Sequence, residues 1–297
     1  MNTRNLRFRS NRVRDILFLF HEELDGMYGV GEVGVFCEML FGAFLGWDKV
    51  RLLTSKEQTI DQSDLLRFHW ALEDLKRQRP VQHIIGYTDF CGCRIKVTPD
   101  VLIPRPETEE MVNSLTPVSS PTGEGCRILD LCTGSGCIAI ALKKAFPQAE
   151  VTAVDVSEKA LVIAKENAES NNTDINFIQA DLLAHHYPLP TTHYSLIISN
   201  PPYVRESERA QMQRNVLDYD PSLALFVPDD DPLRFYKAIA NIAKNHLAPQ
   251  GMLVVEINEA LADETCDVLR VVGLVPAVHT DFRGKSRWVS AVWNPSK

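Results

Sequence analysis

Four consecutive residues, Asn200-Pro201-Pro202-Tyr203, follow an apolar run and carry groups that can grip a planar nitrogen. The Asn200 side chain offers a carbonyl acceptor, and a proline lacks an N–H, so its own carbonyl can face a ligand while the ring stiffens the loop. Two carbonyls at fixed angles can hold both hydrogens of an NH₂ group, and the Tyr203 ring can pack on the flat face of the substrate. An Asn-Pro pair also starts ordinary turns. Its place at the end of an expected strand favours a catalytic segment that acts on an amide or amino nitrogen.

A glycine-rich stretch, Cys132-Thr133-Gly134-Ser135-Gly136, marks a second site. Glycines at a strand-to-helix turn let the backbone approach a ligand, with helix N–H groups facing it. Asp155 follows about 20 residues later, where a carboxylate can accept hydrogen bonds from both hydroxyls of a ribose. Asp181 can accept from an adenine amino group, and Leu182 can cover the ring. The predicted cofactor-binding residues are Cys132, Thr133, Gly134, Ser135, Gly136, Asp155, Asp181, Leu182 and Asn200.

The glycine-rich stretch alone does not identify the cofactor, because residues 134–139 also fit the G-x-G-x-x-A pattern of dinucleotide-binding proteins. A nicotinamide oxidoreductase therefore stays open, although nothing after Asp155 resembles a hydride-transfer site. An amide nitrogen is a weak nucleophile because its lone pair is delocalised, so the site must gain rate from position and alignment. A sulfonium supplies the good leaving group that such a reaction needs. The two motifs together favour S-adenosyl-L-methionine as the cofactor.

The elements that must position these residues can be read from residue 127 onward. Strand-like apolar runs lie at 127–131, 151–154, 175–179, 195–199 and 252–257. Helical patterns lie at 137–146, 157–171, 232–247 and 259–272. Such alternation predicts a parallel sheet with helices on both faces. Two final runs, 275–279 and 287–293, have no helix between them and predict a terminal hairpin, which gives the α/β, Rossmann-like architecture of a class I S-adenosylmethionine-dependent methyltransferase domain.

The first 80 residues differ in pattern. Residues 12–79 show helical periodicity, with the glycines at 26, 29, 31 and 34 expected between helices. Residues 81–100 carry two short apolar runs around a turn-prone stretch and predict a β-hairpin. We therefore expect three parts: a small helical domain at 1–80, a β-hairpin linker at 81–100 and the methyltransferase domain at 101–297.

Composition limits the class of protein. The net charge is −8, which argues against a protein that mainly coats nucleic acid. No apolar run reaches the roughly 20 residues needed to span a bilayer. The seven cysteines are odd in number and complete no zinc pattern, so we expect reduced thiols in a cytoplasmic protein without a metal. Five arginines among residues 1–14 are interpreted as a basic arm, a composition that transit peptides share. A surface loop is expected at 116–125.

The pairing of residues 130–136 with Asn200-Pro201-Pro202-Tyr203 resembles the N5-glutamine methyltransferases that act on peptide chain release factors. Four further stretches are similar to that family: residues 79–86, 102–109, 221–225 and 281–287. The resemblance implies that the substrate is the glutamine of the Gly-Gly-Gln motif and that the helical domain helps to dock the release factor. It also implies that Asn200 touches both cofactor and glutamine, while Pro201 to Tyr203 complete the glutamine clamp. A monomer without stable nucleic-acid or membrane binding is expected.

Some residues depart from the family pattern or have no assigned role. Cys132 stands where many methyltransferases have glycine, so we expect its backbone at an ordinary φ. Leu182 stands where some relatives have an aromatic residue, which would weaken stacking on adenine. Arg105 can pair with a carboxylate of the cofactor or of the protein, and Glu256 ends a strand near the site. An N6-adenine DNA or RNA methyltransferase and a non-catalytic adaptor for release factors or ribosomes remain as alternatives.

Overall fold

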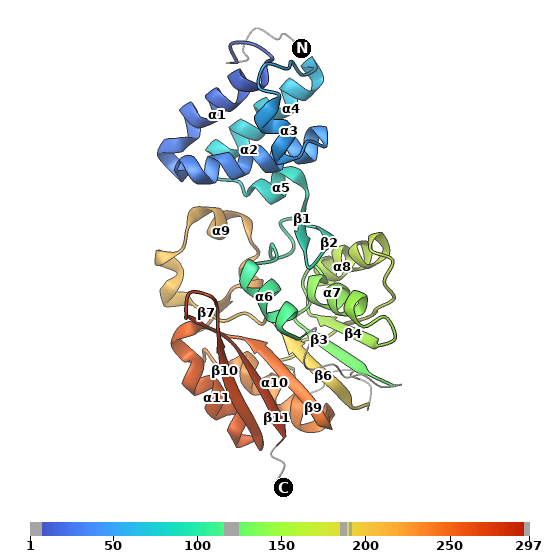
Figure 1. The fold of residues 1–297 in the computed structure, drawn as a ribbon. Coiled ribbons are helices and arrows are strands. Elements are labelled where there is room, and N and C mark those ends of the chain that lie inside the picture. Colours follow the sequence, from blue (N-terminus) through green and yellow to red (C-terminus); the bar gives the residue numbers. More distant parts are fainter. Residues whose placement is uncertain (1–7, 116–124, 185–188, 190–191, 294–297) are drawn as a thin grey trace. The chain divides into compact units, whose positions relative to one another are not determined.

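The computed structural model describes residues 8–115, 125–184, 189 and 192–293. The start of the arginine-rich arm and most of the loop expected at 116–125 lie outside these residues. The chain divides into two compact units, Met1–Gly86 and Tyr87–Lys297, each of which has its own core (Figure 1).

The first unit consists of helices around an aromatic centre. Its helices are α1 (Val13–Tyr28), α2 (Val30–Leu45), α3 (Lys49–Thr54), α4 (Gln62–Lys76) and α5 (Val81–Ile85). The rings of Phe41 and Phe68 lie 4.4 Å apart, centroid to centroid, where α2 and α4 meet. Of the four early glycines, only Gly29 separates two helices, with φ +84°. The glycines at 26, 31 and 34 lie inside α1 and α2, so that part of the prediction is wrong: burial of the neighbouring apolar residues outweighs the modest helix preference lost at each glycine.

The short segment after Pro80 also differs from the expectation. Residues 81–85 form helix α5 and not the start of a hairpin. Pro80 precedes that helix with an extended backbone, and Gly86 ends it in the left-handed conformation with φ +91°. These are the start and stop signals of a helix, and they outweigh the β-branched residues between them. The hairpin itself is shorter, with β1 (Tyr87–Phe90) paired to β2 (Cys93–Lys96).

The second unit contains a mixed seven-stranded sheet. Its strands are β3 (Arg127–Leu131), β4 (Glu150–Asp155), β5 (Asn176–Gln179), β6 (Tyr194–Ser199), β9 (Leu247–Glu256), β10 (Leu274–Thr280) and β11 (Ser286–Trp293). The strand order is β10-β11-β9-β6-β3-β4-β5. Only β11 runs against its neighbours, pairing antiparallel with both β9 and β10. This sheet is the predicted α/β architecture.

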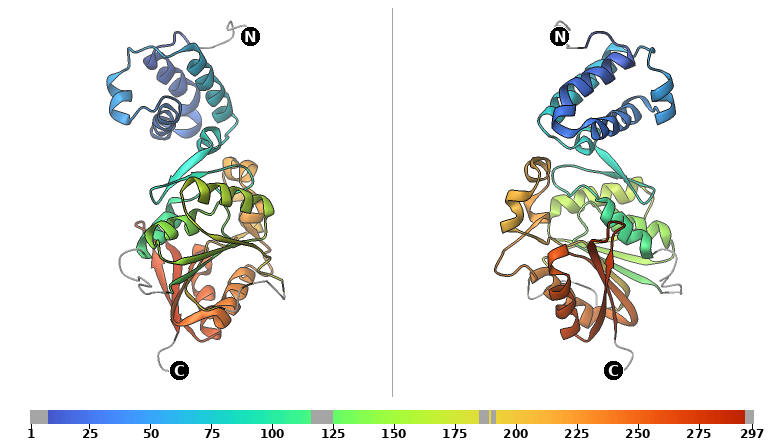
Figure 2. Two further views of the ribbon diagram at one scale, coloured as in Figure 1. Left: turned by 90° about the vertical axis from the view of Figure 1, so that its right-hand side faces the viewer. Right: turned by 60° about the vertical axis from the view of Figure 1, so that its left-hand side comes forward.

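Helices cover both faces of the sheet (Figure 2). The first face carries α6 (Pro106–Leu115), α7 (Cys137–Ala145) and α8 (Glu158–Ser170), and the second carries α10 (Arg234–His246) and α11 (Ala262–Val271). Each layer forms a separate apolar core with the sheet. Because parallel strands are buried on both faces, their sequences read as continuous apolar runs, which is why their positions were predictable.

No helix or strand was predicted for the segment between β6 and α10. It contains β7 (Val204–Arg205), η2 (Glu206–Gln211), α9 (Arg214–Tyr219), η3 (Ser222–Ala224) and β8 (Phe226–Val227). Its helices are too short to show a periodic apolar face.

In the part of the chain that the structure describes, none of the helices has the length and apolar character of a membrane span.

Candidate functional site

A cavity of about 350 Å³ opens at the carboxyl ends of β3, β4 and β6. Carboxyl ends of parallel strands are where open α/β sheets bind ligands. The cavity brings together most of the predicted site residues: Cys132, Thr133, Gly134, Ser135, Asp155, Asp181, Leu182, Asn200 and Pro202. Three predicted residues, Gly136, Pro201 and Tyr203, do not line it.

The glycine-rich loop starts with an unexpected backbone conformation. Cys132 has φ +60°, so the prediction of an ordinary φ is wrong. The chain leaves β3 here, and the Thr133 N–H still donates to the Val154 carbonyl at 3.0 Å, on the neighbouring strand β4. That turn requires a left-handed residue at position 132, and the surrounding hydrogen bonds hold a non-glycine residue in it. Burial raises the pKa of the Cys132 thiol well above its ordinary value.

Gly136 is required by packing as well as by φ. It has φ +81° and directly precedes α7. A Cβ at this position would lie 3.1 Å from the Ala164 Cβ on α8. The loop therefore packs tightly against α8 behind it. Gly136 does not line the cavity, but it lets the loop that does so pack closely against α8.

Asp155 links two segments at the tip of β4. One carboxylate oxygen accepts from the Gly134 N–H at 2.8 Å, and the other accepts from the Ser157 N–H at 2.9 Å. Burial raises the pKa of Asp155, and these backbone hydrogen bonds oppose the rise. An ionised carboxylate has about four acceptor positions, so acceptor capacity remains for a diol.

A second carboxylate, Asp130, lies beneath the loop and is fully buried. The Thr133 hydroxyl donates to it at 2.5 Å. Burial raises the pKa of Asp130 to about 7, and the hydrogen bond from Thr133 opposes the rise. Asp130 thus supports the loop from the core side.

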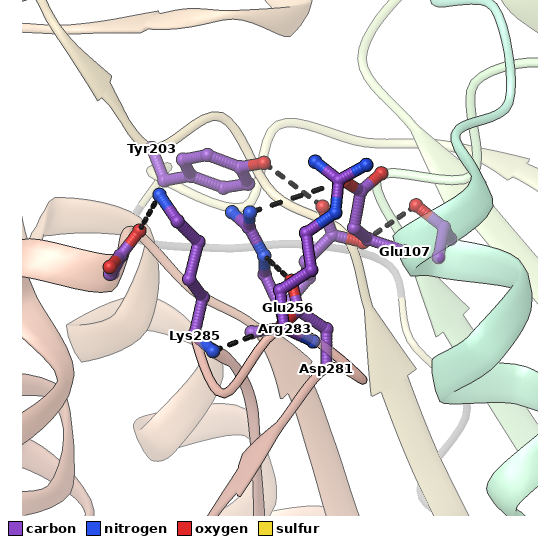
Figure 3. Close-up of polar contacts among 9 residues, drawn as sticks. Glu107, Tyr203, Glu256, Asp281, Arg283 and Lys285 are labelled. Atoms are coloured by element: carbon purple, nitrogen blue, oxygen red, sulfur yellow. Dashed lines mark hydrogen bonds and ion pairs between the residues drawn. The ribbon is translucent and has the colours of Figure 1, made fainter.

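The acceptor side of the cavity is held by side chains from distant segments. Glu256, which ends β9, is buried, and its carboxylate accepts from the Tyr203 hydroxyl at 3.0 Å and from the Thr108 hydroxyl at 2.6 Å (Figure 3). Thr108 in turn accepts from the Asn200 Nδ2 at 3.1 Å. Burial raises the pKa of Glu256, and the hydrogen bonds from the two hydroxyls oppose this rise. Tyr203 therefore points its hydroxyl at Glu256, and the prediction that its ring packs on a substrate stays a prediction.

Arg105, which lines the cavity, forms an ion pair with a residue that is far away in the chain. The Arg105 guanidinium lies 2.5 Å from the buried Asp220 carboxylate. Burial raises the pKa of Asp220, and the positive charge of Arg105 opposes the rise. Of the two partners considered for Arg105, the protein carboxylate is the one observed. Sequence reasoning missed Thr108 and Asp220. Thr108 lies within the stretch 102–109 that resembles the glutamine methyltransferases, which was the only available signal.

The residues that line the cavity suit an adenosine-like cofactor. Asp155 offers oxygen acceptors at one wall, while Val101, Leu102, Ile138 and Leu182 add apolar surface. A cavity of about 350 Å³ falls within the usual range for ligand pockets, roughly 300–1,000 Å³. In the described part of the chain, no group of three His, Cys, Asp or Glu residues could hold a metal ion.

Comparisons with known proteins agree on one family. The family model described as "Methyltransferase small domain" matches residues 111–218, and the one described as "PrmC N-terminal domain" matches residues 28–86. A release factor glutamine methyltransferase of Bacteroides thetaiotaomicron is 38% identical over 91% of this chain and 96% of its own length. One from Flavobacterium psychrophilum is 40% identical over 84% of this chain and 88% of its own.

Among solved structures, the hMettl16 catalytic domain, crystallised in complex with the MAT2A 3′UTR hairpin 6, matches with a TM-score of 0.52. The alignment covers 78% of this chain and 82% of that one, at 17% identity. At that identity the likeness concerns the fold, and it agrees with a class I methyltransferase domain.

Proposed function

The chain belongs to the release factor glutamine methyltransferase family, and on that premise we propose that it methylates the side-chain amide nitrogen (N5) of the glutamine in the Gly-Gly-Gln motif of peptide chain release factors. S-adenosyl-L-methionine is the proposed methyl donor. The observation that carries the proposal is that Asn200 and Pro202 line the same cavity as Asp155 and the loop 132–135. Acceptor clamp and cofactor loop face the same space, as direct methyl transfer requires.

The proposed role of the cofactor side is to bind and orient. Asp155 receives the ribose hydroxyls, Asp181 the adenine amino group and Leu182 the adenine face, while residues 132–136 surround the remainder. When bound, the cofactor supplies a methyl group on a sulfonium, which is a good leaving group. The protein does not have to generate the electrophile, so its residues act mainly by alignment.

The proposed role of the acceptor side is to hold the glutamine amide. The Asn200 Oδ1 accepts one N–H, and a backbone carbonyl of the Pro201-Pro202 segment accepts the other. With both hydrogens held, the nitrogen lone pair has a fixed direction, and alignment of this kind can replace several kcal/mol of barrier. Tyr203 completes the wall behind this segment.

We also propose that the helical first unit docks the release factor, and that the protein acts as a cytoplasmic monomer. The match of the first unit to a named N-terminal family domain supports a dedicated role for it. The net charge of −8 supports a protein substrate over a nucleic acid. Light scattering of the purified protein tests the monomer.

The decisive experiment is mass spectrometry of release factors after incubation with the protein and isotopically labelled S-adenosyl-L-methionine. We expect label on the glutamine of the Gly-Gly-Gln motif, and none on a release factor that carries Glu there. Asn200→Ala should lose activity by roughly a thousandfold while it keeps its fold. Asn245→Ala, which removes an exposed amide bonded within α10, is the matched control and should keep full activity. Label in nucleic acid alone, or an undiminished rate in Asn200→Ala, would overturn the proposal.

A further inference from the structure

We propose that Thr108 and Glu256 are positioning residues that fix the orientation of the Asn200 amide and thereby let the site distinguish an amide substrate from a carboxylate. The inference rests on the proposed function. It adds two residues outside the Asn-Pro-Pro-Tyr segment to those that determine how the substrate is held. Three hydrogen-bonded groups from α6, β9 and the end of β6 carry the argument.

The relay begins at Glu256, which is 3% exposed. Its Oε1 faces the Tyr203 hydroxyl at 3.0 Å, and its Oε2 faces the Thr108 hydroxyl at 2.6 Å. A carboxylate can only accept hydrogen bonds, whereas a hydroxyl has one proton to donate. Both hydroxyls therefore direct their protons at Glu256.

The next link follows from the single proton of Thr108. Since that proton is directed at Glu256, the Thr108 oxygen can only accept from its other neighbour, Asn200. The Asn200 group that faces it, at 3.1 Å, must then be the NH₂ and not the carbonyl. The hydrogen-bond network thus determines which end of the Asn200 amide faces Thr108.

The consequence appears on the cavity side of Asn200. With Nδ2 directed at Thr108, Oδ1 is the group left for a ligand, and it has no hydrogen-bond partner among the described residues. An outward acceptor suits the NH₂ of a glutamine and repels the oxygens of a glutamate. If the Asn200 amide were flipped, its NH₂ would face the NH₂ of a glutamine substrate, and the site would favour glutamate instead. A site that leaves a buried polar group unpaired rejects the wrong substrate strongly.

The test compares Thr108→Val with Thr108→Ser. Valine keeps the shape without the hydroxyl, and serine keeps the hydroxyl. The readout is the inhibition constant of a release factor carrying Gly-Gly-Glu divided by the KM of the Gly-Gly-Gln factor. Thr108→Val should lower this ratio roughly tenfold, the effect of one hydrogen bond, and should lower kcat by about 10- to 100-fold. Thr108→Ser should restore both.

A matched control separates the relay from general stability. Thr265 is fully buried, and its hydroxyl donates to the Leu261 carbonyl at 2.7 Å on the second face of the sheet. Thr265→Val should cost similar stability and leave the ratio unchanged. An unchanged ratio in Thr108→Val, or an equal change in Thr265→Val, would overturn the inference. If the wild-type protein fails to methylate the Gly-Gly-Gln factor, the proposed function falls first.

Glu256→Met provides a second variant should Thr108→Val fail to fold. Methionine has a similar length but carries no acceptor oxygen, so the Thr108 proton is no longer directed at position 256 and can turn toward Asn200. The ratio should then fall again. A folded Glu256→Met protein with the wild-type ratio would count against the relay as directly as the valine variant.

Discussion

The two sides of the cavity are held in place by different kinds of interaction. On the cofactor side, the loop 132–136 is fixed by backbone hydrogen bonds, left-handed residues and a carboxylate that binds backbone N–H groups. On the acceptor side, Asn200 and Tyr203 are fixed by side chains that come from residues about 50 to 90 positions away. Each side also contains a buried carboxylate, Asp130 or Glu256. The cofactor side should therefore be sensitive to backbone strain, and the acceptor side to the loss of single hydroxyls.

The largest expected effect on stability concerns the carboxylate beneath the cofactor loop. Folding raises the pKa of Asp130 from 3.8 to about 7, so its stabilising contribution is complete below about pH 4 and is lost as the pH rises through about 7. Asp130→Asn removes this titration. Between about pH 5 and pH 8, the free energy of unfolding of the wild type should fall by about 3 kcal/mol relative to the variant. Urea unfolding of both proteins at the two pH values measures it, and parallel pH profiles would contradict it.

Asp155→Ala tests the carboxylate that faces the cavity. The variant loses the link between Gly134 and Ser157 and the proposed acceptor for the ribose, so affinity for S-adenosyl-L-methionine should fall by on the order of 100-fold. Calorimetric titration gives the value. Asp174→Ala, an exposed carboxylate between α8 and β5, should bind normally. Equal affinities in the two variants would remove Asp155 from the cofactor site.

Gly136→Ala tests how far backbone conformation governs the loop. The added Cβ meets Ala164 at 3.1 Å in a residue with φ +81°, so the free energy of unfolding should fall by roughly 2–3 kcal/mol. Gly284 has a similar φ, +77°, but nothing lies within 4 Å of its Cβ position. Gly284→Ala should therefore cost only about 1 kcal/mol. Thermal unfolding of both variants separates packing from strain, and equal losses would show that packing adds nothing at Gly136.

The smallest of these effects is expected for the Tyr203 hydroxyl on the acceptor side. Tyr203→Phe removes one of two donors to Glu256, which should cost about 1–2 kcal/mol of unfolding free energy and raise the KM for the release factor severalfold. The cofactor dissociation constant should stay unchanged. Tyr236→Phe is the control, because its hydroxyl donates to the main-chain carbonyl of Glu256 at 3.2 Å and not to the carboxylate. A similar rise of KM in both variants would mean that the carboxylate contact has no special role.

The same contrast explains what could be read from the sequence. The sheet and its helices were predictable because fully buried parallel strands appear as apolar runs, and the cofactor loop because its glycines and Asp155 have a fixed spacing. Thr108 was not predictable as a partner of Asn200, because no local pattern marks a contact between α6 and the end of β6. Cys132 was predicted wrongly because a thiol residue at φ +60° is held there by hydrogen bonds that only the folded sheet provides. The roles assigned to the site residues remain predictions.

The order of the strands has a consequence for how the site is made. Strand β11, which follows β9 and β10 along the chain, does not lie at an edge but between them. During synthesis, β9 therefore lacks one neighbour until residues 286–293 have left the ribosome, and the strand that carries Glu256 stays exposed along that side. The acceptor clamp gains its full sheet support only after residues 286–293 have emerged, whereas the β3–β4 pair beside the cofactor loop can form before them. A nascent chain of this protein should therefore gain the ability to bind its cofactor before it can grip a substrate.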